Sequence, residues 1–136
     1  MNDVLENVLD YVAAKDPIIA LVGARVYAGE LGKEEIEKMP RKAIVVRIDG
    51  GAEKTGTKPI VRPRIEIWAF GETYHEAGQV DRAVFDALDT LKRQIVNGFL
   101  LHGAIMASGS RMMRFGLSGW PMIIRTGTVI ADDGTA

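Results

Sequence analysis

The chain has 136 residues, a net charge of −1 at pH 7 and no cysteine. This length is typical of one domain, which we expect to span residues 1–136. Without cysteine, disulfides, thiolate metal sites and a cysteine nucleophile are excluded, and a net charge near zero gives no global attraction to nucleic acid or anionic lipid. No apolar run approaches the roughly 20 residues that cross a bilayer, so no membrane partner is expected.

Two helices are predicted at the N-terminus. Residues 3–14 repeat apolar side chains at helical spacing, which predicts an amphipathic helix. Residues 16–23 predict a second, shorter helix. Asp16 is expected to be its N-cap, Pro17 its first helical residue and Gly23 its left-handed end.

A brief strand and a charged loop are predicted next. Residues 24–28, ARVYA, predict a brief strand. Residues 29–40 are charged and end in proline, which predicts a loop with one helical turn. The adjacent acids Glu34 and Glu35 are interpreted as solvated surface, because a calcium loop needs many more oxygen ligands.

The middle of the chain predicts a β-hairpin with a long tip. Residues 42–49 and 60–70 are rich in β-branched side chains and predict two strands, with one apolar face in the second of them. Arg47 and Glu66 are expected to pair across these strands. Residues 50–59 hold three glycines and a proline, and they are expected to form an irregular tip longer than the usual hairpin loop of two to five residues.

The strongest helical pattern covers residues 74 to about 96, where one apolar stripe runs along the whole segment. Asp89 and Arg93 would form an i,i+4 pair on this helix. After Asn97 and Gly98, residues 99–115 and 120–132 predict two more strands. Four methionines lie in these two strands, where they more often fill a core than face a partner, although two could do so: Met106, Met112, Met113 and Met122.

A His-Glu pair begins the long helix. A zinc protease helix needs a second histidine one turn later, and the residues that follow His75 and Glu76 do not supply one. His102 lies in a predicted strand. The pattern from Thr73 to Glu76 instead matches a capping box, so we expect a helix cap and no metal site.

No catalytic or cofactor motif is present. Residues 51–58 have the glycine spacing of a P-loop, but Thr57 and Lys58 are in the wrong order and a strand follows where a helix should begin. We therefore expect no catalytic residues, no metal and no cofactor.

Three stretches of the sequence resemble one known family. They are DPIIALVGARVYAG, which begins at Asp16, the strand PRIEIWAF, which begins at Pro63, and the polar cap and alanine-rich helix that follow that strand. The chain resembles the tail-completion, or tail-to-head-joining, proteins of long-tailed bacteriophages, which grade into tail terminators. The acidic residues 29–40 depart from the proline-rich passage that is common in this family.

The resemblance implies an α+β fold with one antiparallel sheet of about four to five strands, packed by an N-terminal helix and one long central helix. It also implies a homo-oligomeric ring, usually a hexamer, between the tail tube protein and a head-completion or connector protein. Such a ring sits in the virion, terminates the tube and joins tail to head. It leaves a passage for DNA without specific nucleic-acid binding, and no cofactor or catalysis is implied.

Two interpretations from other classes stay open on the residues alone: a small α+β ligand-binding domain, and a regulatory adaptor domain of a cellular protein. Partner contacts are expected at the hairpin tip, which is polar and rich in glycine. The residues expected to make these contacts are Glu53, Lys54, Lys58, Arg62 and Arg64.

Overall fold

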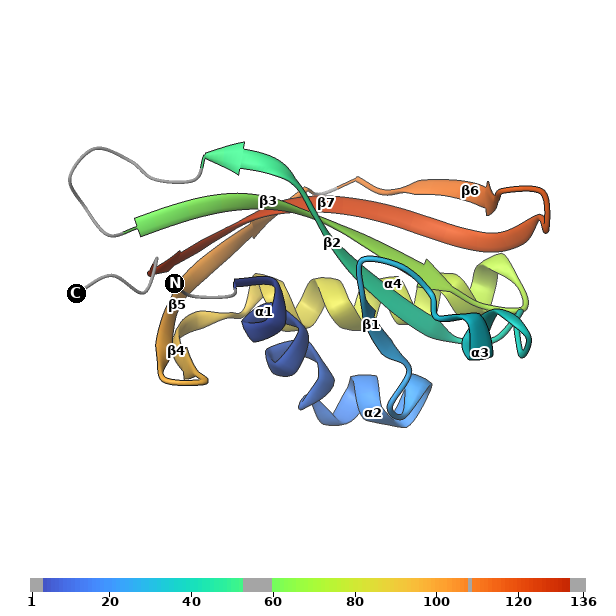
Figure 1. Ribbon diagram of the computed structural model, residues 1–136, viewed down its shortest axis with the longest axis horizontal. Helices are drawn as coiled ribbons and strands as arrows, with labels where there is room; N and C mark the ends of the chain where they lie inside the picture. Colours follow the sequence, from blue (N-terminus) through green and yellow to red (C-terminus); the bar gives the residue numbers. More distant parts are fainter. Residues whose placement is uncertain (1–3, 53–59, 108, 133–136) are drawn as a thin grey trace.

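The computed structural model describes residues 4–52, 60–107 and 109–132. They form two layers, in which a curved sheet is covered on one face by helices (Figure 1). The helices are α1 (Val4–Ala13), α2 (Asp16–Val22), α3 (Lys33–Ile36) and α4 (Tyr74–Asp89). The strands are β1 (Val26–Ala28), β2 (Ala43–Ala52), β3 (Ile60–Phe70), β4 (Lys92–Val96), β5 (Phe99–Met106), β6 (Arg111–Phe115) and β7 (Trp120–Asp132).

The sheet has seven strands in the order β1-β2-β3-β7-β5-β4, with β6 paired to β7 beside that path. The α+β class is confirmed, whereas the prediction of four to five strands is wrong. All pairings are antiparallel except that of β1 with β2. At 13 residues, β7 is long enough to pair with β6 along its first half and with β5 along its second half.

The main core lies between the sheet and the helices. Alternate residues of the central strands point toward α1, α2 and α4, as the period of a strand requires. Ile65, Ile67 and Ala69 of β3 are buried there, while Trp68 is only partly buried on the opposite face. The apolar stripe of α1 also enters this core, and the Tyr11 hydroxyl donates to the Ala87 carbonyl at 3.0 Å, joining α1 to α4.

A second, smaller core lies on the opposite face of the sheet. Phe70, Met122 and Ile124 are buried there, with Leu31 from the segment that leads into α3. Partly buried aromatic side chains surround them, including Trp68, Phe115 and Trp120. The Phe115 and Trp120 rings stack with centroids 5.5 Å apart, which fixes the hairpin that joins β6 to β7.

The long helix is shorter than predicted. α4 ends at Asp89, where the Thr90 hydroxyl donates to the Asp86 carbonyl at 2.8 Å. Residues 92–96 then form β4, so Asp89 and Arg93 do not share a helix. Asn97 and Gly98 both have positive φ and turn the chain into β5, which is the geometry of a tight two-residue hairpin.

Other predicted boundaries also change. Residues 99–115 form two strands, β5 and β6, rather than one. Residues 50–52, predicted as part of the tip, continue β2, and the rest of the tip lies outside the described residues. Lys15, not Asp16, is the N-cap of α2 and makes no side-chain cap bond, while Gly23 ends that helix at φ 60° as predicted.

A buried ion pair ties α4 to β7. Arg125 donates to both carboxylate oxygens of Asp81, at 3.0 and 2.7 Å, and its third hydrogen bond goes to the Ala107 carbonyl at 2.7 Å. The two side chains are only 10% and 7% exposed, and the guanidinium lies over the Phe85 ring. Among the described residues, no helix is long and apolar enough to cross a membrane.

Candidate functional site

The predicted contact residues of the hairpin are only partly within the structure. Glu53, Lys54 and Lys58 lie outside the described residues. Arg62 and Arg64 are exposed on β3, at the base of the tip. The Arg64 Nε atom donates to the Asp49 carbonyl at 3.0 Å and lies 3.6 Å from the Asp49 carboxylate, which braces β3 against β2.

The predicted helix cap is present with one change. The Thr73 hydroxyl accepts from the Glu76 amide at 3.2 Å, which satisfies an otherwise orphaned donor. The Glu76 carboxylate accepts from the Glu72 amide at 3.4 Å, not from residue 73 as predicted. The return hydrogen bond of the cap therefore comes from the amide of Glu72, one residue before Thr73.

The two histidines lie on different elements. His75 is exposed in the first turn of α4, and His102 is on β5, with its Nε2 atom 2.8 Å from the Asp132 carboxylate. The part of the chain that the structure describes holds no group of three or more histidine, aspartate or glutamate side chains that could bind a metal ion.

The predicted pair of Arg47 and Glu66 is directly opposed in register, but both side chains engage Trp68. The Arg47 guanidinium lies 4.7 Å from the centre of one ring of Trp68, and the Glu66 carboxylate accepts the indole N–H at 2.5 Å. These two contacts hold the indole ring on the outer face of the sheet, away from the helices.

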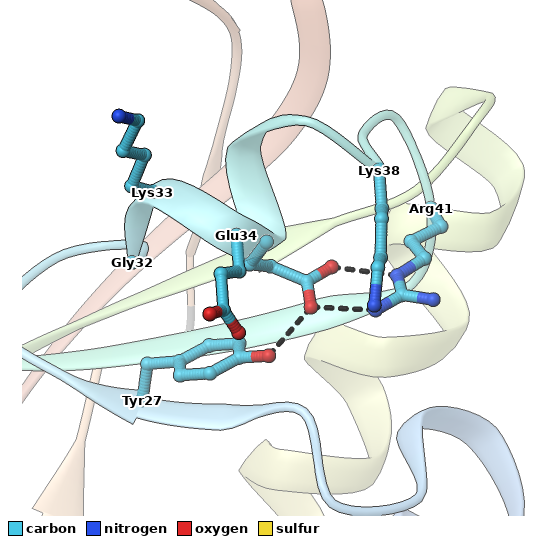
Figure 2. Close-up of a pocket in the computed structure, with 7 residues that line it drawn as sticks. Tyr27, Gly32, Lys33, Glu34, Lys38 and Arg41 are labelled. Carbon is cyan, nitrogen blue, oxygen red and sulfur yellow. Dashed lines mark hydrogen bonds and ion pairs between the residues drawn. The ribbon is translucent and has the colours of Figure 1, made fainter.

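The segment between β1 and β2 forms a polar pocket around a buried carboxylate (Figure 2). Glu35, on α3, is only 5% exposed. It accepts one hydrogen bond from the Tyr27 hydroxyl at 2.5 Å and two from the Arg41 guanidinium, both at 2.6 Å. This bidentate geometry is the strongest form of the arginine–carboxylate pair. It corrects the prediction that both adjacent acids are solvated.

The three groups shift one another's protonation. The hydrogen bonds from Arg41 hold the pKa of Glu35 below its usual value, against the opposing effect of burial. Burial and the hydrogen bond to Glu35 raise the pKa of Tyr27. At neutral pH the carboxylate is therefore ionised and the phenol is neutral.

The pocket is open, with a volume of about 400 Å³, and Lys33, Glu34 and Lys38 complete its lining. The hydrogen bonds that the Glu35 carboxylate accepts come from Tyr27 and Arg41, so it is a fixed anchor that joins α3 to β1 and to the segment just before β2. The arrangement suits a structural clamp that shapes the protein surface. The contact of Tyr27 and Arg41 with Glu35 could not be predicted from the sequence, because the three residues lie in separate segments of the chain.

The chain is similar to known proteins in fold but not in sequence. No known family model matches the sequence, and no curated protein sequence is significantly similar to it. A chain in the virion of a native gene transfer agent particle matches 95% of this chain and 94% of its own length, with a TM-score of 0.72 and 16% identity. The chain shares its fold with a virion protein.

A second solved structure has a related fold. The gp17 protein of bacteriophage SPP1 matches 96% of this chain and 90% of its own length, with a TM-score of 0.50 and 15% identity. The two matches share little sequence with this chain, so the likeness lies in the fold. One of the two belongs to a virion particle and the other to a bacteriophage, and both are likenesses of fold alone.

Proposed function

We propose that this chain is a structural component of a phage or phage-like particle. In this proposal it forms a ring, hexameric in the resembling family, between the tail tube and the head connector, where it terminates the tube and joins tail to head. The observation that carries the proposal is the fold shared with a gene transfer agent virion chain over 95% of the length. The partners are further copies of the chain, the tail tube protein and the connector, and DNA passes through the ring.

The site geometry supports a structural role rather than a catalytic one. The buried carboxylate of Glu35 is satisfied by Tyr27 and Arg41 and serves as an anchor. The ion pair of Asp81 and Arg125 likewise joins two elements. Both clusters rigidify the surface that such a ring would present to its neighbours.

Deletion of the gene from the particle's genome tests the function. Without this protein we expect separate filled heads and tails, and tails of irregular length, in electron micrographs. Supplying the chain from a plasmid should restore complete particles. Complete particles with tails of normal length in the deletion strain would show that the chain has another role.

The tip of the β2–β3 hairpin is proposed to contact a neighbouring ring or the end of the tube, through Glu53, Lys54 and Lys58, with Arg62 and Arg64 at its base. Replacing residues 53–57 by an Asn-Gly turn, which leaves Gly51 and Ala52 in β2, should keep or slightly raise the melting temperature, because a shorter loop costs less entropy to close. The same change should reduce the number of complete particles. A shortened chain that folds and still supports full assembly would show that the tip is a passive loop.

A further inference from the structure

One end of the sheet is a five-stranded strip with two open margins. There, β7 lies between β6 and β3, and β2 lies between β3 and β1, so the strip has the order β6-β7-β3-β2-β1. Within the described residues, β6 pairs only with β7, and β1 pairs only with β2. Figure 1 shows β6 at the upper right of the sheet, with β1 and α3 below it. The two margins therefore face away from each other across the strip.

The first margin, here called the β6 margin, comprises Arg111, Met112, Met113 and Leu117. Met112 is 69% exposed, Met113 is 39% exposed, and Leu117 projects fully into solvent at the turn after β6. No acidic residue occurs between Gly109 and Ala131. The Arg111 side chain makes no hydrogen bond or ion pair within the described residues. The edge is thus apolar and positively charged, and an exposed apolar strand edge is a ready site for another chain.

The second margin, here called the α3 margin, comprises Glu30, Glu34, Ile36 and Glu37. All four side chains are exposed, Ile36 by 44%. The fourth acid of the segment, Glu35, is neutralised by Arg41. Lys33 and Lys38 are also exposed on this segment, so its three exposed acids leave an excess of one negative charge. The margin therefore pairs an exposed isoleucine with acidic side chains, which complements the apolar and basic β6 margin.

We propose that the β6 margin of one copy docks on the α3 margin of the next copy, so that the chain assembles head to tail. This inference rests on the proposed ring and names the surfaces that build it. A contact between two different patches closes into a ring when the rotation between copies allows. Pairing of β6 with itself in the register that places Arg111 opposite Arg114 is disfavoured, because like charges directly opposite each other repel.

Two double variants remove one margin each. Arg111→Glu with Met112→Ser alters the β6 margin, and Glu34→Lys with Glu37→Lys alters the α3 margin. Matched controls make the same changes of charge and polarity at similarly exposed residues elsewhere on the surface. Arg82→Glu with Ile95→Ser uses an exposed arginine and an isoleucine that is 67% exposed, and Asp86→Lys with Asp89→Lys uses two exposed acids.

Sedimentation velocity and native mass spectrometry then give the assembly state of the full chain. We expect the wild type and both controls to form rings, and each margin variant alone to stay at the monomer mass of 14.8 kDa. An equal mixture of the two margin variants retains one intact contact per pair. It should therefore form a heterodimer through the unaltered β6 margin of one variant and the unaltered α3 margin of the other, whereas an isologous contact would give homodimers of one variant.

The outcomes separate this inference from the proposed function. If the margin variants form rings as the wild type does, the surfaces are wrong and the ring function stands. If the wild type stays monomeric alone but completes particles, the variants are scored by particle counts, and normal counts overturn the inference. A wild type that neither assembles nor completes particles overturns both.

Discussion

At the scale of single residues, the charged side chains that matter most are the ones that the sheet and helices bury. Glu35 is held between a phenol and a guanidinium, and its ionised form is favoured because Arg41 donates two hydrogen bonds to it. Because the pKa of Glu35 is lower in the folded chain than in the unfolded one, the folded state gains stability above the usual glutamate range. That gain is lost as the pH falls through the lowered pKa.

The substitution Glu35→Gln tests this linkage, since glutamine keeps the shape and an acceptor for Tyr27 but has no charge. We expect the variant to be less stable than the wild type near neutral pH, by about 1–3 kcal/mol. The difference should shrink as the pH drops below about 4.3, where a free glutamate becomes protonated. Urea melts at both pH values measure it. A difference that does not change with pH would show that Glu35 does not carry this dependence.

The ion pair between Asp81 and Arg125 gives a second prediction at this scale. Asp81→Ala leaves a guanidinium that is only 10% exposed without its anion, and breaking such a pair costs about 3–5 kcal/mol. Asp81→Leu combined with Arg125→Met removes both charges and should be less destabilising than Asp81→Ala. Denaturant melts of the variants decide this. A double variant as unstable as the single one would mean that packing, not the lost partner, sets the cost.

At the scale of the element, the start of α4 depends on its cap. Thr73→Ala removes the acceptor for the Glu76 amide and should cost about 0.5–2 kcal/mol of stability. Glu76→Gln should cost less, because glutamine also accepts a hydrogen bond at this position. Thermal or denaturant melts are the measurement, and no change for Thr73→Ala would contradict the cap.

The chain between β3 and α4 requires glycine for steric reasons. A Cβ atom on Gly71 would lie 2.6 Å from the Ala77 amide nitrogen and 2.7 Å from the Glu76 Cβ atom. Gly71→Ala should therefore force the helix start away from the sheet, at a cost of about 1–3 kcal/mol. Gly32→Ala is the control, because nothing lies within 4 Å of its new methyl group and its φ is −69°. Equal stability of the two variants would contradict this account.

The elements that could be predicted from the sequence are those whose apolar spacing is unambiguous. The bounds of β3 match the prediction, and more buried and less buried residues alternate along it from Val61 to Ala69. The end of α4 was misplaced because Leu91 and Ile95 continue the helical spacing by coincidence, whereas the backbone already turns at Thr90. The burial of Glu35 could not be predicted because its partners, Tyr27 and Arg41, lie in different segments. Local sequence patterns do not indicate a contact of that kind.

At the scale of the whole molecule, the helices cover one face of the sheet, and the other face carries only the smaller core. The four methionines of β5, β6 and β7 differ in the same way, since some pack against a core and others are exposed. Met122 is buried in the smaller core and Met106 packs against the main core, while Met112 and Met113 reach the surface on β6. The two exposed methionines belong to the margin that we propose joins neighbouring copies.

Because β7 lies in the centre of the sheet, the sheet can fold completely only after β7 has been synthesised. Its partners are far back along the chain, since Phe70 pairs with Met122 and Ile60 pairs with Asp132. During synthesis, the helices, the β2–β3 hairpin and the β4–β5 hairpin emerge first, yet β6 has no strand to join until β7 leaves the ribosome. Contacts so distant in sequence slow folding. A chain cut short before β7 would keep the residues of the β6 margin but lack the strand that positions them, and on the proposed geometry such a product could not occupy a full place in the ring.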